Sequence, residues 1–420
     1  MPWQIIWSTT LKLDCISVMN KKCPISESGM LEKVLSSAAQ AVLLIDSGKC
    51  TLDDVLDRAP DDCRRTLEHL LTLIYRYRKS IRRSWQKFCR KMPLPAIAAL
   101  LDTALTQCRF QQAVIPQSTV NVAVTLAKSL HADKFVNAVL RAALREVFVE
   151  PQRADEILPD AVLRRWRQNF SAEQVENFAR LFLSKPEFTF RLCGGAPLPE
   201  GSTPIAGFAP FAFAAGKAAS VIGTPEFAMG SYYIQDPAAS WAVSLAADVL
   251  KKCRTLLDIC CAPGGKTLQA AELLSPQAKI VAADISRSRQ RLTAENFARF
   301  GVNAQIITAD PAELSGVFDL VIADLPCSNS GVFRRRPDAL WRFDGKSLSE
   351  VMKLQKYILG HAIRLTAPGG YLLISTCSIE ADENNALLDV GALKLISSGT
   401  ILPDTVHDGA FAALMQKVEC

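Results

Sequence analysis

Hydrophobic residues recur at helical spacing through the first part of the chain. From Met30 to about Val149, apolar side chains return every three or four positions, as expected for helices that bury one face. Helices are predicted at 61–80, 94–110, 117–130 and 134–147. Residues 30–150 are therefore predicted to form an all-α domain, and about 120 residues is an ordinary size for an independent core.

From Tyr232 onward, short apolar runs alternate with helical stretches. The predicted strands are 255–259, 279–283, 304–308, 318–323 and 371–376. Helices are predicted at 237–251, 266–275, 286–300 and 346–366. This alternation predicts an α/β domain over residues 231–420 with a parallel, doubly wound, Rossmann-like sheet. Two later runs, Leu393–Ile396 and Ala410–Met415, are expected to add an antiparallel pair.

Two segments lack such clear patterns. Residues 1–29 show no helical periodicity, and they lack the basic, apolar and small-residue segments that follow one another in a signal peptide. We therefore expect a disordered leader, or a translation start upstream of the true one. Residues 151–230 form a connector, with a helix predicted at 158–170 and a strand at 188–193. Its stretch rich in Ala, Gly and Pro, residues 194–219, predicts no definite element.

Composition narrows the class of protein only slightly. The net charge of +6 permits a polyanionic partner without requiring one. Thirteen cysteines are too few for a disulfide scaffold of 420 residues, and no C-x-x-C pair occurs. We therefore expect reduced thiols, no metal site and a cytoplasmic protein. No apolar run approaches the ~20 residues that span a bilayer, so no membrane association is expected.

One stretch of the helical region is strongly basic. Residues 76–91 contain no acidic residue, and aromatic residues lie between the basic ones, which include Arg82, Arg83 and Lys87. This combination suits contact with a phosphate backbone together with base stacking. A solvated helix face with buried aromatic rings explains the same pattern equally well, and both interpretations stay open.

A glycine turn follows the first strand of the α/β region. The strand at Thr255–Ile259 leads through Ala262-Pro263-Gly264-Gly265 into a helix from Lys266, an arrangement that presents backbone N–H groups to a ligand. A P-loop would require glycine at Cys260. The dinucleotide fingerprint also fails, because the two glycines are adjacent. The turn therefore suits a nucleoside ligand without a pyrophosphate.

Acidic residues end three successive strands near this turn, namely Asp258, Asp284 and Asp310. Asp284, about 20 positions beyond the turn, is suited to bind the two hydroxyl groups of a ribose. Asp310 could bind an adenine amino group. S-adenosylmethionine fits this arrangement best. The predicted cofactor contacts are Cys260, Cys261, Ala262, Pro263, Gly264, Gly265, Lys266, Asp284, Asp310 and Asp324.

The next two strands each deliver a cysteine to the same sheet edge. One ends in Asp324-Leu-Pro-Cys327-Ser and the other in Thr376-Cys377-Ser. With Cys-x-Ala-Pro-Gly-Gly-Lys-Thr at 260–267, these motifs resemble the Sun family of RNA (cytosine-5)-methyltransferases, and more closely its RsmB-type members, which modify small-subunit ribosomal RNA. Residues 115–128 and 135–141 are similar to the NusB-like domain that precedes the catalytic domain in those enzymes, and residues 233–240 and 408–411 also match the family.

The resemblance implies a role for each of four residues. Cys377 would be the nucleophile, because a thiolate added to cytosine C6 activates C5 toward a methyl group on sulfur. Asp324 would bond to the N3/N4 edge of the base, Cys327 would assist loss of the C5 proton and release, and Lys266 would orient these groups. Arg334, Arg335 and Arg336 are placed to hold flanking phosphates, and the connector would be an accessory RNA-binding region.

Departures from the family pattern, at Leu325, Asn329-Ser330-Gly331 and Cys261, remove no reactive group. The substrate expected is ribosomal RNA, free or partly assembled, with the protein acting as a monomer. Three alternatives remain: the same chemistry on transfer RNA, a non-catalytic RNA-binding assembly factor, and a zinc or redox cluster of Cys260, Cys261, Cys327 and Cys377.

Overall fold

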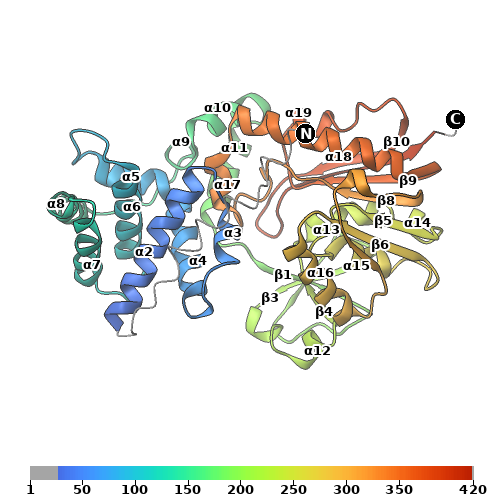
Figure 1. Ribbon diagram of the computed structural model, residues 1–420, viewed down its shortest axis with the longest axis horizontal. Helices are drawn as coiled ribbons and strands as arrows, with labels where there is room; N and C mark the ends of the chain where they lie inside the picture. Colours follow the sequence, from blue (N-terminus) through green and yellow to red (C-terminus); the bar gives the residue numbers. More distant parts are fainter. Residues whose placement is uncertain (1–26, 419–420) are drawn as a thin grey trace. The chain divides into compact units, whose positions relative to one another are not determined.

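The computed structural model describes residues 27–418, and the chain divides into two compact units, one up to Pro159 and one from Asp160 (Figure 1). The predicted leader, 1–29, lies almost wholly outside the described residues. No helix within 27–418 is long and apolar enough to cross a membrane.

The first unit is entirely helical. Its elements are α2 (Glu27–Asp46), α3 (Leu52–Leu56), α4 (Asp61–Arg76), α5 (Arg78–Gln86), α6 (Pro95–Phe110), α7 (Pro116–Lys128), α8 (Asp133–Leu144) and α9 (Ala154–Ile157). Apolar faces of α2, α5, α6, α7 and α8 meet in one core around Trp85 and Leu101. The helix predicted at 61–80 is two helices, because the chain leaves helical geometry at Tyr77, whose ring stacks on Phe110 at 4.4 Å between centroids.

The second unit contains two sheets. The smaller is antiparallel, with strands β1 (Phe188–Leu192), β2 (Thr203–Ile205), β3 (Ala212–Gly216) and β4 (Tyr232–Ile234) in the order β2-β3-β1-β4. Two of its strands lie within 194–219, where the sequence predicted no element. Helices α10 (Asp160–Asn169) and α11 (Ala172–Leu183) precede this sheet. The region from residue 160 to 230 thus belongs to the same compact unit as the large sheet.

The larger sheet has seven strands in the order β10-β11-β9-β8-β5-β6-β7. They are β5 (Thr255–Asp258), β6 (Lys279–Asp284), β7 (Gln305–Thr308), β8 (Phe318–Asp324), β9 (Thr366–Thr376), β10 (Leu393–Ile401) and β11 (Ala410–Lys417). The first five are parallel to one another, and β10 and β11 form the predicted antiparallel pair at the edge. The structure confirms the α/β sheet preceded by a helical region.

Helices cover both faces of this sheet, as strands buried on both sides require. Leu320 and Ile322 of β8 pack with α13 (Pro237–Leu245), α14 (Ala247–Leu250) and α15 (Gly265–Ala271). The alternate residues Val321 and Ala323 pack against α18 (Gly345–Leu365). Figure 1 shows α18 along one face and α13 and α15 on the other, with α16 (Arg287–Phe300) beside them. The carboxyl ends of β5, β6, β8 and β9 therefore share one edge.

Candidate active site

The glycine turn joins β5 to α15 and depends on both of its glycines. Gly264 has a φ of 98°, a left-handed conformation that side chains disfavour, and a Cβ there would lie 2.8 Å from the Phe297 ring. A Cβ on Gly265 would meet the Tyr233 ring at 3.0 Å. Larger residues would push the turn away from Tyr233 and Phe297, so the two glycines fix where its backbone lies.

Asp258 ends β5 beneath this turn and is almost completely buried. Its Oδ2 accepts a hydrogen bond of 2.6 Å from Thr267 Oγ1. The other oxygen, Oδ1, is buried and has no hydrogen-bond partner among the described residues. Burial raises the pKa of Asp258 to about 7. An unpaired carboxylate oxygen at a ligand-binding edge can accept a bond from a cationic ligand.

The next two strand-end aspartates also lie at this edge. Asp284 accepts bonds from the backbone N–H groups of Ser286 (2.8 Å) and Ala262 (3.2 Å), so it connects β6 to the glycine turn. Asp310, just after β7, accepts a 2.6 Å bond from Tyr357 Oη of α18. Each aspartate is therefore held in place at the sheet edge.

The two predicted catalytic cysteines meet. Cys327 follows β8 and Cys377 follows β9, and their sulfur atoms lie 3.1 Å apart. Both side chains are half-buried. The Cys377 thiol also donates to Asn329 Oδ1 at 3.2 Å. The fold thus brings together two thiols that are 50 residues apart in sequence.

A charged pair lies on the same edge as the thiols. Lys266 Nζ is 2.7 Å from Asp324 Oδ2, and Ser375 Oγ donates to Asp324 Oδ1 at 2.7 Å. Although burial opposes it, attraction to Asp324, Asp258 and Cys377 leaves the pKa of Lys266 raised. All four predicted catalytic residues, Asp324, Cys327, Cys377 and Lys266, therefore lie at one edge of the sheet.

The three arginines predicted to hold RNA differ in their surroundings. Arg334 is buried and donates to Asp408 Oδ1 (3.2 Å), and Arg335 donates to Asp408 and Asp236. These bonds connect the loop after β8 to Asp236, directly before α13, and to Asp408, just before β11. Arg336 is exposed, and its Nη1 lies 3.3 Å from Asn329 Oδ1. The guanidinium groups of Arg334 and Arg335 are thus engaged within the protein.

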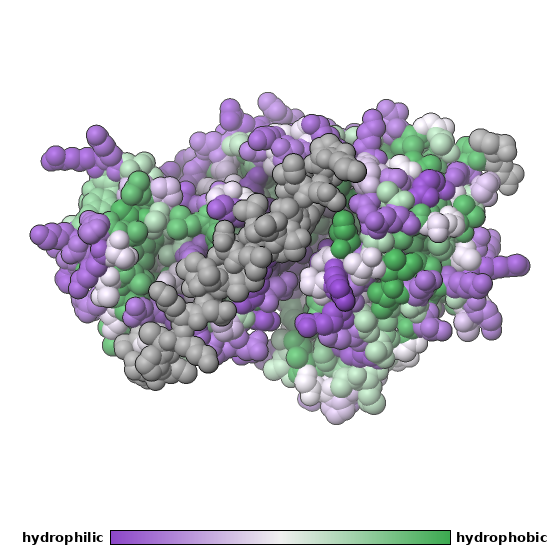
Figure 2. Space-filling model, in the orientation of Figure 1, coloured by the Kyte–Doolittle hydropathy of each residue, from purple (hydrophilic) through white to green (hydrophobic). Residues whose placement is uncertain are grey.

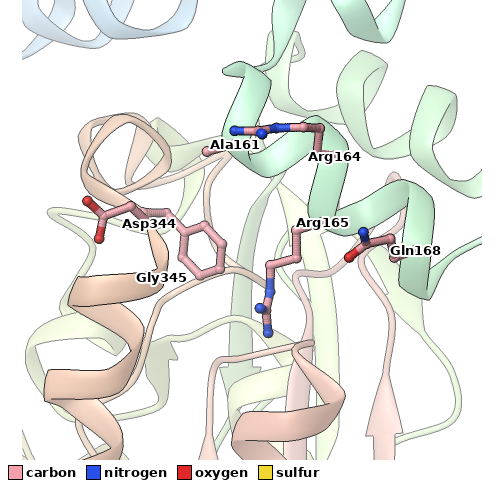
Figure 3. Close-up of a pocket in the computed structure, with 7 residues that line it drawn as sticks. Ala161, Arg164, Arg165, Gln168, Asp344 and Gly345 are labelled. Atoms are coloured by element: carbon pink, nitrogen blue, oxygen red, sulfur yellow. The ribbon is translucent and has the colours of Figure 1, made fainter.

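Helix α10 braces the loop that follows Cys377. Trp166 Nε1 donates to Glu380 Oε1 at 2.9 Å, and Arg165 pairs with both Glu380 and Asp382. Helix α10 also lines a pocket of about 330 Å³ together with residues 343–345 (Figure 3). Neither thiol nor the glycine turn lines this pocket. In Figure 3 the Arg164 and Arg165 side chains point in different directions from α10.

The basic stretch 76–91 has mixed surroundings within the helical unit. Arg82 Nε is 2.9 Å from the buried Asp102, and Lys87 pairs with Glu146. Arg83 is exposed, as are Arg90 and Lys91 in the loop after α5. Figure 2 shows hydrophilic side chains projecting at the margin where Figure 1 draws this loop. Part of the stretch thus holds the helices together, and part faces solvent.

Sequence reasoning missed Glu383, in α19 (Ala381–Asn385), which contacts the loops carrying both thiols. It also missed Asn329, which touches the Cys377 sulfur. Of the serines that follow the two cysteines, Ser378 was a usable signal, because its hydroxyl donates to Glu383, whereas Ser328 donates through its backbone N–H group. The sequence around Glu383 itself gives no sign that this residue contacts the two thiol loops.

Comparison with known proteins agrees with this geometry. Residues 248–412 match the family model described as 16S rRNA methyltransferase RsmB/F, and residues 35–145 match the NusB family. Ribosomal RNA small subunit methyltransferase B of Shewanella oneidensis is 38% identical over 165 residues, which make up 38% of this chain and 38% of that relative. The probable ribosomal RNA small subunit methyltransferase B of Synechocystis is 26% identical over 375 residues, 77% of this chain and 83% of that relative.

Solved structures share the fold. The crystal structure of PH0851 aligns with a TM-score of 0.72 at 21% identity and covers 94% of this chain and 100% of that one. NSun6 from Pyrococcus horikoshii, solved with SFG, aligns with a TM-score of 0.54 at 18% identity and covers 63% of this chain and 99% of that one.

The doubly wound sheet, the glycine turn and the strand-end aspartates agree with the match of residues 248–412 to a methyltransferase family model. Residues 248–412 are thus similar to the RsmB/F methyltransferases, and residues 35–145, in front of them, are similar to the NusB family. The resemblance predicted from the cysteine motifs and the glycine turn is confirmed.

Proposed function

We propose that this protein methylates C5 of one cytosine in small-subunit ribosomal RNA through a covalent bond to Cys377. The observation that carries the proposal is the pair of thiols, with sulfur atoms 3.1 Å apart, at the edge that also holds the Lys266–Asp324 pair. The RsmB/F family match supports ribosomal RNA as the substrate.

The site suits S-adenosylmethionine as the methyl donor. Asp258 Oδ1 is a buried acceptor with no partner among the described residues, and the glycines bring the turn's backbone to the same edge. Asp258 and Asp284 would hold the cofactor together with the turn from Cys260 to Lys266. When bound, the cofactor supplies a methyl group on a positively charged sulfur.

Cytosine C5 is too weak a nucleophile to take that methyl group unaided. In the proposed reaction, the Cys377 thiolate forms a bond to C6, and the electron pair of the C5–C6 double bond becomes available at C5. Asp324, held by Lys266 and Ser375, accepts a hydrogen bond from the N4 amino group at the N3/N4 edge, and the Lys266 ammonium beside it offsets the negative charge that the addition places on the ring. The base must first leave its helix or loop, at a cost of a few kcal/mol.

After C5 has been methylated, it still carries its proton. The Cys327 sulfur, as a thiolate, accepts this proton, and the electron pair of the C5–H bond re-forms the double bond as the C6–sulfur bond breaks and Cys377 leaves as a thiolate. Cys377 is thereby released and the RNA leaves. The 3.1 Å between the sulfur atoms supports this role, because Cys327 would then lie beside the bond that breaks.

Mass spectrometry of ribosomal RNA incubated with the protein and labelled S-adenosylmethionine tests the activity. One labelled 5-methylcytosine is expected, and bisulfite sequencing of a deletion strain should show that cytosine unmodified. Loss confined to transfer RNA would favour the transfer-RNA alternative. Absence of methylation on any RNA would favour a non-catalytic assembly factor.

Two cysteine substitutions test the mechanism. Cys377→Ala should abolish both methyl transfer and the covalent adduct. Cys327→Ala should leave a protein–RNA adduct that persists on a denaturing gel. Cys108→Ala, the same change in the helical unit, is the control and should behave like the unaltered protein. Methyl transfer by Cys377→Ala would contradict the proposed nucleophile, and a missing adduct in Cys327→Ala would contradict the release role.

A further inference from the structure

The side chain of Asn329, in the loop after β8, connects the two thiols. The Cys377 thiol donates to Asn329 Oδ1 at 3.2 Å, and Asn329 Nδ2 donates to the backbone oxygen of Cys327 at 3.1 Å. Asn329 and Cys377 are 48 residues apart in the chain. The carboxamide therefore contacts the sulfur that the proposed reaction uses, and it is anchored to the loop that carries the other sulfur.

Three neighbours fix the orientation of this carboxamide. Arg336 Nη1 lies 3.3 Å from Asn329 Oδ1, on the same oxygen that accepts from the Cys377 thiol. A guanidinium group can only donate a hydrogen bond, and a backbone carbonyl such as that of Cys327 can only accept one. Exchanging the two ends of the carboxamide would set donor against donor and oxygen against oxygen, so one orientation serves all three contacts.

The bond to Asn329 also orders the pair of thiols. A thiol carries one hydrogen, and that of Cys377 is directed at Asn329 Oδ1. The contact of 3.1 Å between the sulfur atoms is then made by the hydrogen of Cys327. The three residues thus form a closed ring, in which the Cys377 sulfur accepts from Cys327 and donates to Asn329, and Asn329 donates back to Cys327.

The backbone of Asn329 has a conformation that favours glycine. Its φ is 61°, and within residues 27–418 the one other non-glycine residue with a positive φ is His131, at 52°. Asparagine tolerates this left-handed conformation better than most residues, but glycine takes it without steric cost. Backbone outliers of this kind cluster at functional sites. The presence of a side chain here therefore points to a use for the carboxamide.

The loops do not depend on this carboxamide to stay together. The Gly331 N–H group donates to Cys377 O at 2.9 Å, and the Ile379 N–H group donates to Ser330 Oγ at 2.9 Å. These bonds join the loop after β8 to the loop after β9 through backbone groups. The carboxamide of Asn329 is thus additional to the bonds that hold the loops, and its contact with the loop after β9 is made to the sulfur.

We propose that Asn329 is a positioning residue that holds the Cys377 sulfur in one staggered position beside Cys327. A cysteine side chain has three staggered positions about its Cα–Cβ bond, and the hydrogen bond to Oδ1 selects one of them. This proposal rests on the proposed function, which makes Cys377 the nucleophile, and it adds the group that aims that nucleophile.

Asn329→Gly tests the proposal, because glycine keeps the left-handed backbone and removes the carboxamide. Single-turnover methyl transfer to ribosomal RNA should slow by at least about threefold, since the sulfur then divides among three staggered positions. Affinity for S-adenosylmethionine and the melting temperature should stay unchanged. His131→Gly makes a matched change at the exposed left-handed position in the helical unit, and it should keep the full rate.

A second measurement follows the sulfur itself, without RNA. Iodoacetamide alkylation at a series of pH values, read by mass spectrometry of the Cys377 peptide, reports the thiolate fraction. In Asn329→Gly the midpoint of this profile should move to lower pH by about 0.5, because a hydrogen bond donated by a thiol favours its protonated form. Asn329→Asp keeps the oxygen but adds a negative charge beside the sulfur, so the midpoint should move to higher pH.

The opposite directions of these two shifts separate the bond from a loosened loop. The charged groups around the thiols, namely the Lys266–Asp324 pair, Glu383 and Arg336, are the same in both variants. Loosening of the loop would speed alkylation at every pH without moving the midpoint. Buried Cys253 should stay protected throughout, since it reacts only if the domain opens.

An unmoved midpoint in Asn329→Gly, or a shift in the same direction in both variants, would overturn the bond to Cys377. A methyl-transfer rate in Asn329→Gly equal to that of the unaltered protein would overturn the positioning role. Failure of the proposed function looks different, because the unaltered protein would then methylate no RNA. The alkylation contains neither RNA nor S-adenosylmethionine, so it still decides whether Asn329 acts on the sulfur.

Discussion

Gly331 lies where the two thiol loops meet the segment before β11, and replacing it with alanine tests how closely the site is built. Its N–H group donates to Cys377 O at 2.9 Å, and its carbonyl accepts from the Gly409 N–H group at 2.8 Å. A Cβ at Gly331 would lie 2.5 Å from Gly409 O and 2.8 Å from Cys377 O. Both are backbone atoms, so no side chain can rotate to make room.

The distances set the size of the effect. Moving both oxygens to about 3.5 Å, an ordinary contact distance for carbon, requires shifts of about 1 Å at Gly409 and about 0.7 Å at Cys377. A misplacement of about 1 Å in a catalytic group costs on the order of 100-fold in rate. Overpacking of this kind also costs about 1–3 kcal/mol of unfolding free energy.

We therefore expect Gly331→Ala to transfer methyl groups about 100-fold more slowly than the unaltered protein. Its affinity for S-adenosylmethionine should be unchanged, because the glycine turn lies on other strands. Initial rates with labelled cofactor and isothermal titration calorimetry measure the two quantities. Gly360→Ala in α18 is the matched control, because a Cβ there meets nothing within 4 Å. It should keep the full rate, and a Gly331→Ala rate within threefold of it would refute this reasoning.

The further predictions concern three charged residues, Asp258, Arg165 and Arg83. Because burial raises the pKa of Asp258 to about 7, affinity for the cationic cofactor should rise about tenfold per pH unit up to that value, and calorimetry should show this dependence lost in Asp258→Asn. The same raised pKa favours the folded, cofactor-free protein at low pH, and this contribution is lost as the pH rises through about 7. Arg165→Ala leaves the buried Glu380 without its cation and should lower the unfolding free energy by about 3 kcal/mol in thermal melts, against less than about 0.5 kcal/mol for the exposed Arg164→Ala. If exposed Arg83 contacts an RNA phosphate, Arg83→Gln should reduce the salt dependence of RNA binding by about one counterion in filter-binding assays.

Local patterns in the sequence were enough to predict most of the fold. The predicted strand 255–259 and the helix from residue 266 correspond to β5 and α15, because alternation and helical spacing are properties of consecutive residues. The prediction of one helix at 61–80 was wrong, because the chain breaks at Tyr77 into α4 and α5. The hydrophobic pattern also failed within 194–219, where the short strands β2 and β3 form half of the antiparallel sheet.

The sequence by itself determined that Cys327 and Cys377 end neighbouring strands beside a glycine turn, and this was sufficient to predict an S-adenosylmethionine-dependent methyltransferase. The reason is topological, since parallel strands present their carboxyl ends at one edge. Only the tertiary structure decided which charges remain available there. It pairs Arg334 and Arg335 with Asp408, more than 70 residues away, and it buries Glu383 between the thiol loops. Ion pairs and buried hydrogen bonds join residues far apart in the chain, so they leave no periodic trace in the sequence.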